Sequence, residues 1–312
     1  MLIRTEFDIR FHLAQSVPIV ALLHLHPSLA GRVVSGNHVQ AEQGDWQHGN
    51  QAGAAAGSRI ATEEYQDSFG NRCTRLVAPA GTIRLSGHAV VENDGLPDPI
   101  FAYAQQAGVE DLPAEVLQFL LPSRYCEVDK FCSIAQDLFG WMTPGWTRAT
   151  AIRDWVHEKV AFNYKAARPT KTAMDVFTER VGVCRDFQHL AVTLSRCQNI
   201  PARYVTGYLG DIRSTYSGAG DFSAWYEVWL DGRWMTMDAR HNVPRVGRVL
   251  MATGRDAADV AITTSFGNAD LAHFFVDSNE ISADGTVVRV AGAPPLVRKP
   301  LAGLTPSVGI GA

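Results

Sequence analysis

One cysteine in this chain has the type and surroundings expected of a nucleophile. Cys184 follows Gly182-Val183, where an irregular segment gives way to a helical pattern. The free amides and the positive dipole end at a helix N-terminus favour an anion, so a thiolate there gains stability and nucleophilic character. Asp238 closes the second strand of a predicted hairpin farther along the chain. The position of Cys184 therefore predicts covalent chemistry at a sulfur atom.

Both residues also have ordinary structural explanations. A cysteine on a helix is often a small buried hydrophobe, and an aspartate at a strand end is often a turn or cap residue. Cys197 lies on the apolar stripe of the same predicted helix as Cys184, so we assign it to core packing. Asp186 is interpreted as a first-turn acid that the helix dipole favours.

The stretch DFSAWYEVWLDGRWMTMDARHN, residues 221–242, positions the aspartate. Asp231-Gly232 is a strong two-residue turn signal, so we predict a β-hairpin in which residue 230 lies opposite residue 233. In that register 225 lies opposite 238, and 223 lies opposite 240. Alternate positions of paired strands share one face. The side chains grouped on that face are Ser223, Trp225, Asp238 and Arg240.

Helical spacing surrounds the cysteine. An apolar stripe from Cys184 to Cys197 predicts an amphipathic helix that ends before Pro201, and residues 202–209 predict a strand. Three- and four-residue spacing also predicts helices over 113–139 and 147–160. We therefore interpret residues 96–150 as a helical connector and residues 151–285 as the core.

Residues 1–95 have a different periodicity. Every second position from Ile3 to Leu13 is apolar except Thr5, and this alternation predicts a half-buried antiparallel strand. Two further strands flank a predicted turn at Phe69-Gly70-Asn71, and residues 41–57 are rich in Gly, Ala and Gln and predict a loop. The pattern predicts an N-terminal β-sandwich over 1–95. The Pro- and Gly-rich residues 286–312 predict a loosely held tail.

The segment GVCRDFQHLAVTLSRCQNIPARYVTGYLGD, followed by SAWYEVWLDGRWMTMDARHN, resembles the transglutaminase-like superfamily of bacterial cysteine enzymes. Members have a nucleophilic Cys at a helix start after Gly, an IPAR-V-GY strand, a His-Ala-Trp strand and a strand bearing Asp. The helix with Trp155 fits the same pattern, and residues 1–95 resemble the N-terminal β-domain of bacterial members. The resemblance implies an α+β fold in which cysteine-protease-like helices pack on an antiparallel sheet, preceded by a β-sandwich domain.

Carried over position by position, the resemblance makes Cys184 the nucleophile and Asp238 the acid that orients a base. Ser223 stands where the family has the basic histidine, in SAW instead of HAW. A serine is too short for that role, and its hydroxyl is no base near neutral pH. His241 is the candidate replacement, because the strand is predicted to end near Asn242 and the ring can then turn back toward Asp238.

Other residues receive secondary assignments. His189 is a second candidate base, but it lies about 140° around the helix from Cys184, which favours a structural histidine. Arg240 would stabilise a thiolate without accepting its proton. Asn163 and Tyr164 are candidate donors to an oxyanion, by analogy with cysteine proteases. The predicted substrate-binding residues are Ser223, Trp225 and Arg240.

Composition and charge exclude several classes of function. The chain has 312 residues, a formal net charge of −4 and no basic run, so we expect no nucleic-acid partner. Its apolar runs are far shorter than a membrane helix requires, and its N-terminus lacks the apolar core of a secretory signal. Five cysteines without CxxC spacing and scattered histidines predict free thiols, a cytoplasmic protein, no metal site and no cofactor.

We therefore expect a cysteine hydrolase or acyltransferase that attacks an amide of a peptide or protein substrate and forms a thioester on Cys184. Animal-type transglutaminases commonly depend on calcium, and nothing in this sequence forms an acidic calcium loop, so peptide hydrolysis is expected rather than cross-linking. The alternative is a catalytically impaired pseudoenzyme that binds peptides or acts as a scaffold. Ser223 is the main support for that alternative.

Overall fold

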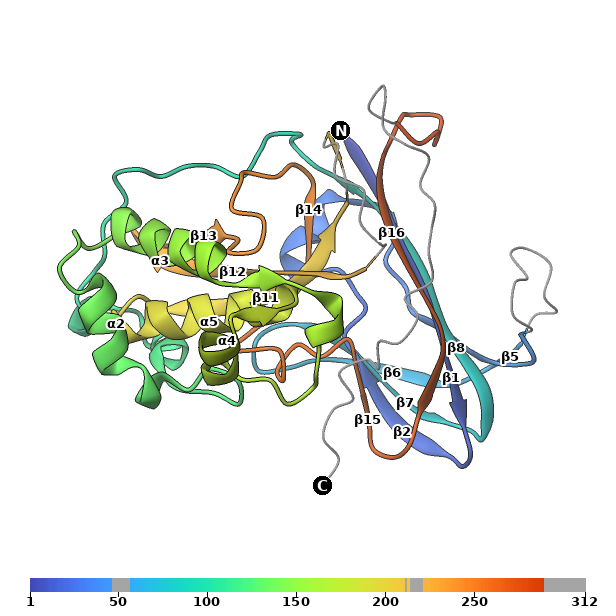
Figure 1. The fold of residues 1–312 in the computed structure, drawn as a ribbon. Helices are drawn as coiled ribbons and strands as arrows, with labels where there is room; N and C mark the ends of the chain where they lie inside the picture. The colour runs from blue at the N-terminus through green and yellow to red at the C-terminus, as the bar shows by residue number, and fades with distance from the viewer. Residues whose placement is uncertain (47–56, 211, 214–220, 289–312) are drawn as a thin grey trace.

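The computed structural model describes residues 1–46, 57–210, 212–213 and 221–288. It consists of a β-sandwich and of a layer of helices packed on another antiparallel sheet; in Figure 1 the helices lie on the left and the long strands on the right. The predicted α+β class is confirmed. Residues 47–56 of the predicted loop and residues 289–312 of the predicted tail lie outside the described residues.

The first sheet of the sandwich is built around the N-terminal strand. Every second residue from Ile3 to Leu13 is buried in that strand, as the alternation predicts. Its strands are all antiparallel, and their order is β16, β1, β8, β4, β5, with β3 also pairing with β8. Their bounds are β1 Leu2–Leu13, β3 Val33–Gly36, β4 Gln40–Gln43, β5 Ser58–Arg59, β8 Gly81–Glu92 and β16 Asp270–Ile281.

The second sheet of the sandwich has the order β15, β2, β7, β6. The bounds are β2 Val17–Ala21, β6 Thr62–Gln66, β7 Arg72–Ala78 and β15 Thr263–Ser265. The predicted turn between β6 and β7 is confirmed: Asp67 Oδ1 accepts from the amides of Phe69 and Asn71, and Gly70 has a φ of 80° that suits glycine. Apolar side chains from both sheets fill the space between them.

The last two strands correct the predicted division of the chain. β15 and β16 lie within the predicted core 151–285, yet they pair with β2 and β1 of the sandwich. The pairing of β16 with β1 extends from Leu2 opposite Ile281 to His12 opposite Asp270. The sandwich is therefore not confined to residues 1–95. Pairing between strands so distant in sequence depends on tertiary packing, and no local signal reveals it.

The second part of the molecule is built around one buried helix, α5. Helices α2, α3 and α4 pack against it on one side, and β11 and β12 of a sheet ordered β13, β12, β11, β14 lie on the other. The helices are α1 Ala114–Leu117, α2 Cys132–Phe139, α3 Trp146–Lys159, α4 Ala173–Glu179 and α5 Cys184–Cys197. The strands are β9 Ala161–Phe162, β10 Val181–Gly182, β11 Ala202–Leu209, β12 Ser223–Leu230, β13 Arg233–Met237 and β14 Arg248–Gly254.

The predicted helix over 113–139 is only partly present. The segment forms the single turn α1, short 3₁₀ turns (η3 Gln118–Leu120 and η4 Val128–Lys130) and then α2. Pro122 explains the interruption, because proline has no amide hydrogen to donate and its ring obstructs the preceding helical turn. Cys126, expected on this helix, lies outside any helix.

Candidate active site

Cys184 is the first residue of α5, as predicted. The residue before it, Val183, donates its amide hydrogen to Asp186 Oδ2 over 3.0 Å. Asp186 is fully buried in the first turn of the helix, which agrees with its predicted position there. Its carboxylate therefore fixes the backbone immediately before the cysteine, where the helix still has unpaired amides.

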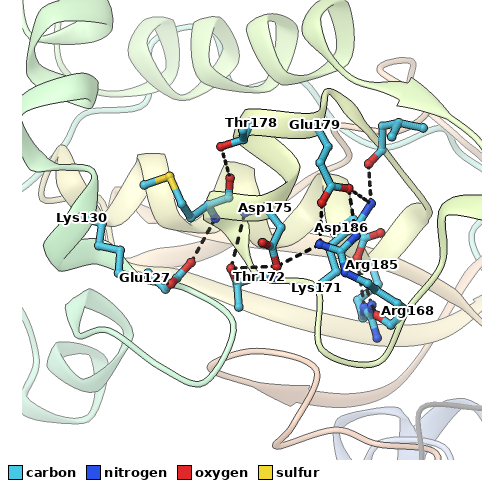
Figure 2. A network of polar contacts seen from close by, with 12 residues as sticks. Glu127, Lys130, Arg168, Lys171, Thr172, Asp175, Thr178, Glu179, Arg185 and Asp186 are labelled. Carbon is cyan, nitrogen blue, oxygen red and sulfur yellow. Dashed lines mark hydrogen bonds and ion pairs between the residues drawn. The ribbon is translucent and has the colours of Figure 1, made fainter.

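A network of charged side chains holds the segment that leads into α5, as Figure 2 shows. The fully buried Lys171 donates from Nζ to the carbonyl of Val181 and pairs with Glu179, both over 2.9 Å. Arg185 pairs with Asp186 over 3.1 Å. Because charge-assisted hydrogen bonds restrict the side chains that form them, this network gives the start of α5 a defined position.

The Cys184 thiol is held in its neutral form. Burial raises the pKa of this thiol to about 11; the nearby carboxyl of Asp221 acts in the same direction, and Arg240 opposes both. The helix N-terminus alone favours a lowered pKa, whereas burial of the sulfur acts in the opposite direction. Attack by Cys184 near neutral pH therefore needs a group that accepts its proton.

Asp238 lies one residue beyond β13 and accepts hydrogen bonds at both oxygens. Oδ1 accepts from the amides of Arg240 (3.0 Å) and His241 (3.1 Å), and from Gln188 Nε2 (3.2 Å). Oδ2 accepts from Arg248 Nη2 over 2.9 Å. Burial alone would raise the pKa of this carboxyl, but Arg248 and His241 hold it well below its usual range. Asp238 is therefore a fixed carboxylate near neutral pH.

His241 pairs with this carboxylate in the way its sequence position predicts. β13 ends at Met237, and the amide of Asn242 donates to the carbonyl of Asp238 over 3.0 Å, so the chain turns sharply here. The His241 Nδ1 then lies 2.9 Å from Asp238 Oδ2. When Nδ1 donates to the carboxylate, Nε2 carries the lone pair, which is the tautomer a general base needs. The role of His241 as the base stays a prediction.

Gln188 is a site residue that the sequence interpretation missed. It lies one helical turn beyond Cys184 on α5, fully buried. Its Nε2 donates to Asp238 Oδ1 and to the carbonyl of Ala224, each over 3.2 Å, and its Oε1 accepts from the amide of Ala239 over 3.1 Å. The four-residue spacing from Cys184 was the available signal, because it places a polar side chain on the same helix face.

Arg248 and Asp98 were also missed. Arg248 donates from Nη2 to Asp238, and its Nε lies 2.9 Å from both carboxylate oxygens of Asp98. The Arg248 guanidinium carbon lies 5.1 Å from the ring centroid of Trp225. Trp225 is only 2% exposed, so a buried ring lies beside the Arg248 guanidinium of this ion pair. Its assignment to substrate binding rests on the sequence pattern alone.

The hairpin register is confirmed, but its continuation beyond the last pair is not. Asp231 and Gly232 form the predicted turn with positive φ, and the final pair is Tyr226 opposite Met237. Beyond that pair the chain turns away from β12, so Ser223 does not pair with Arg240; on the other edge of β12 it pairs with Gly207 of β11. In place of strand pairing, the amides of Arg240, His241 and Asn242 donate hydrogen bonds to Asp238 and form a turn.

Two of the predicted site residues, Ser223 and Arg240, therefore do not stand opposite each other in the sheet. Ser223 begins β12 and is partly exposed. The Arg240 guanidinium carbon lies 4.1 Å from the ring centroid of Phe162 on β9, and its charge acts on Cys184. The positive charge of Arg240 lowers the pKa of the Cys184 thiol, which is the effect expected of a residue that stabilises negative charge on the sulfur.

Asp221 is a further acid near the sulfur that the sequence interpretation did not single out. It precedes Ser223 by two residues in the same DFSAW stretch. Burial raises the pKa of its carboxyl to about 7, with Arg240 opposing. Because its charge also acts on Cys184, a titrating carboxyl lies within electrostatic reach of the thiol. Its position beside the missing histidine was the available signal.

The other candidate residues have structural roles. His189 is buried and stacks on Tyr125 with ring centroids 4.9 Å apart, and its Nε2 accepts from the amide of Ala257 over 3.1 Å. Burial lowers the pKa of His189 well below its usual value, which agrees with the structural interpretation. The Asn163 side chain accepts from the amide of Lys165 over 3.0 Å and caps a short turn.

Among residues 1–46, 57–210, 212–213 and 221–288, no group of three or more His, Cys, Asp or Glu side chains is arranged to hold a metal ion. Across the same ranges no helix has the length and apolar character needed to cross a membrane.

Comparison with known proteins identifies relatives of this arrangement. Residues 133–239 match the family model of the transglutaminase-like superfamily. A crystal structure from Cytophaga hutchinsonii, provisionally named a cysteine protease, is similar over 93% of this chain and 94% of its own, with a TM-score of 0.74 and 29% identity.

Similar sequences occur in mycobacteria. An uncharacterized protein of Mycobacterium leprae is 28% identical over 208 residues, which are 63% of this chain and 73% of that protein. An uncharacterized protein of Mycobacterium tuberculosis is 32% identical over 111 residues, 32% of this chain and 35% of its own length.

Proposed function

Residues 133–239 of this chain form a transglutaminase-like domain, and from that premise we propose a cysteine hydrolase or acyltransferase that acts on peptide or amide bonds through Cys184. The observation that carries the proposal is the set of hydrogen bonds made by the Gln188 side chain. This side chain joins the helix that begins with Cys184 to the loop that holds Asp238 and His241. A nucleophile, a carboxylate and a histidine are thereby brought to one end of one helix.

The chemistry follows from the protonation states. The Cys184 sulfur attacks the carbonyl carbon while a base takes the thiol proton, and the same proton then passes to the nitrogen of the leaving amine. The C–N bond breaks and a thioester remains on the sulfur. Water then cleaves the thioester, which releases a carboxylic acid and restores the thiol. An amine in place of water would give transamidation.

His241 is the proton acceptor in this proposal. Its Nδ1 contact with the Asp238 carboxylate orients the ring and stabilises the imidazolium that forms when Nε2 takes a proton. Arg248 shares the same carboxylate oxygen, so Asp238 divides its charge between a fixed cation and a transient one. Asp221 is the rival acceptor, because its carboxyl lies within electrostatic reach of the sulfur.

Hydrolysis is proposed over cross-linking. The Cytophaga hutchinsonii neighbour, provisionally named a cysteine protease, supports this choice over nearly the whole chain. The substrate class that follows is a peptide or a protein segment with an accessible amide.

The test compares digestion of labelled casein and a peptide-amide library by the wild-type chain and by single variants. Cys184→Ala is expected to lose activity by about 10³-fold or more, because it removes the nucleophile. Cys132→Ala, a matched control at an exposed cysteine of α2, is expected to keep the activity. His241→Ala is expected to lose about 10²- to 10⁴-fold in kcat. If Asp221→Asn causes that loss and His241→Ala does not, Asp221 is the base.

A second candidate function is a peptide-binding module without catalysis. The serine at position 223 and the neutral thiol of Cys184 favour it. In that case the wild-type chain binds peptides from the same library and cleaves none, and Cys184→Ala binds them equally well. Alkylation of Cys184 by iodoacetamide would then show one titration near the pKa of the thiol and no change in His241→Ala.

A further inference from the structure

Two cysteines outside the candidate active site lie beside each other. Cys132 begins α2 and Cys197 ends α5. The Cys132 Sγ is 3.3 Å from the carbonyl oxygen of Val128, and the Cys197 Sγ is 3.4 Å from the same oxygen. Two sulfurs that both contact one oxygen are separated by no more than those two distances together. The thiols are also within hydrogen-bonding reach of each other.

The pair differs in accessibility in the way that stepwise thiol oxidation requires. Cys132 is exposed and Cys197 is partly buried beneath it. Burial and the neighbouring Cys132 raise the pKa of the Cys197 thiol to about 12, so Cys197 is a poor first nucleophile. The exposed sulfur is therefore the one that meets a reagent from solution, and the sheltered sulfur is placed to respond to it.

We propose that Cys132 and Cys197 form a reversible intramolecular disulfide when the protein meets a low-molecular-weight disulfide such as glutathione disulfide. The Cys132 thiolate attacks one sulfur of glutathione disulfide, which forms a mixed disulfide and releases one glutathione. The Cys197 sulfur then attacks Cys132, gives its proton to solvent and expels the second glutathione. Two protein thiols are oxidised by two electrons, and one small disulfide is reduced to two thiols.

The bond would close the chain from α2 to the end of the helix that begins with Cys184. Because the ends of a long segment are joined, the unfolded chain loses freedom and the native state gains stability relative to it. The same bond would join the C-terminal end of α5 to α2 and so restrict movement of the helix that begins with Cys184. The predicted role of Cys197 in core packing is compatible with this chemistry.

The experiment uses the full-length chain with Cys184→Ala, so that the active-site thiol takes no part. The protein is incubated with glutathione disulfide, quenched in acid, alkylated and analysed by intact mass and by peptide mapping. The expected product has lost two thiols, retains no glutathione and contains one cross-linked peptide that joins residues 132 and 197. Dithiothreitol restores both thiols. The oxidised form is expected to unfold about 5 °C or more above the reduced form.

Single variants on the same background identify the two roles. Cys197→Ser is expected to retain one glutathione on Cys132, because the second step is blocked. Cys132→Ser is expected to react at least about ten-fold more slowly. Cys73→Ala, at a buried cysteine of the sandwich, should form the disulfide at the unaltered rate. A background protein that keeps glutathione on Cys132, or that cross-links either cysteine to a different one, overturns the proposal.

Discussion

Asp238 and Cys184 lie at the same end of α5, and burial acts on them in the same direction. In both groups desolvation opposes the charged form and raises the pKa. The Asp238 carboxyl nevertheless ionises far below its usual range, whereas the Cys184 thiol stays neutral up to about pH 11. The two groups differ in their partners.

The carboxylate has a full set of donors, and the thiol has one opposing cation. Asp238 receives hydrogen bonds from a buried guanidinium, a ring nitrogen, two amides and a carboxamide. At Cys184 the Arg240 cation is countered by two carboxyls. The site therefore stores a fixed negative charge on the acid and delays charge on the sulfur until a base removes the proton. A buried group ionises only where the fold supplies enough donors to replace water.

The largest expected effect comes from removing the cation that Asp238 depends on. In Arg248→Met the carboxylates of Asp98 and Asp238 lose their shared partner inside the protein. The free energy of unfolding is expected to fall by about 3–5 kcal/mol, as for other broken buried ion pairs. Urea denaturation at pH 7 measures it.

A matched arginine provides the control. Arg255 pairs with Asp259 over 2.9 Å, but its side chain is 42% exposed. Arg255→Met is expected to cost less than about 1 kcal/mol, because solvent screens the pair. Equal losses in the two variants would show that the buried donors around Asp238 have no special weight.

The partners of Asp238 also show which features the sequence could predict. The hairpin turn, the start of α5 and the contact between His241 and Asp238 follow from local signals: Asp231-Gly232, the apolar stripe after Cys184, and the end of β13. Each depends on residues within a few positions of one another.

Arg248 and Asp98 could not be found in that way, because they meet Asp238 only after β14 and the connector have docked. The pairing of β16 with β1 was missed for the same reason. Burial, and then the charge of Asp221, raise the pKa of Cys184, and folding alone brings about both. Local pattern fixes elements and single turns, while the donors around a buried charge are a property of the assembled fold.

A second prediction concerns low pH, at which the contribution of Asp238 to the free energy of unfolding should disappear. A carboxyl with a lowered pKa in the folded state stabilises the fold above its unfolded value near 4 and loses that contribution as pH falls toward the folded value. Between pH 5 and pH 2 the wild type should lose on the order of 2 kcal/mol more unfolding free energy than Asp238→Asn. Asp137→Asn, on the exposed face of α2, should follow the wild type. Parallel curves for all the proteins would contradict the assignment.

The smallest expected effect is at Asp221, where the pKa shift has the opposite sign to that of Asp238. Burial raises the pKa of this carboxyl to about 7, so the folded state holds its proton more tightly than the unfolded state does. The contribution of this group is then fully present below about pH 4 and is lost as pH rises through about 7. Asp221→Asn keeps a neutral side chain at every pH. It is therefore expected to match the wild type at pH 4 and to exceed its unfolding free energy by about 1 kcal/mol at pH 8, after allowance for partial exposure.

Chemical denaturation at the two pH values measures the difference, with Asp137→Asn as the reference. A difference that is the same at both would mean that Asp221 is solvated like a surface acid, and its carboxylate would then be fully charged near neutral pH and act on Cys184 at full strength.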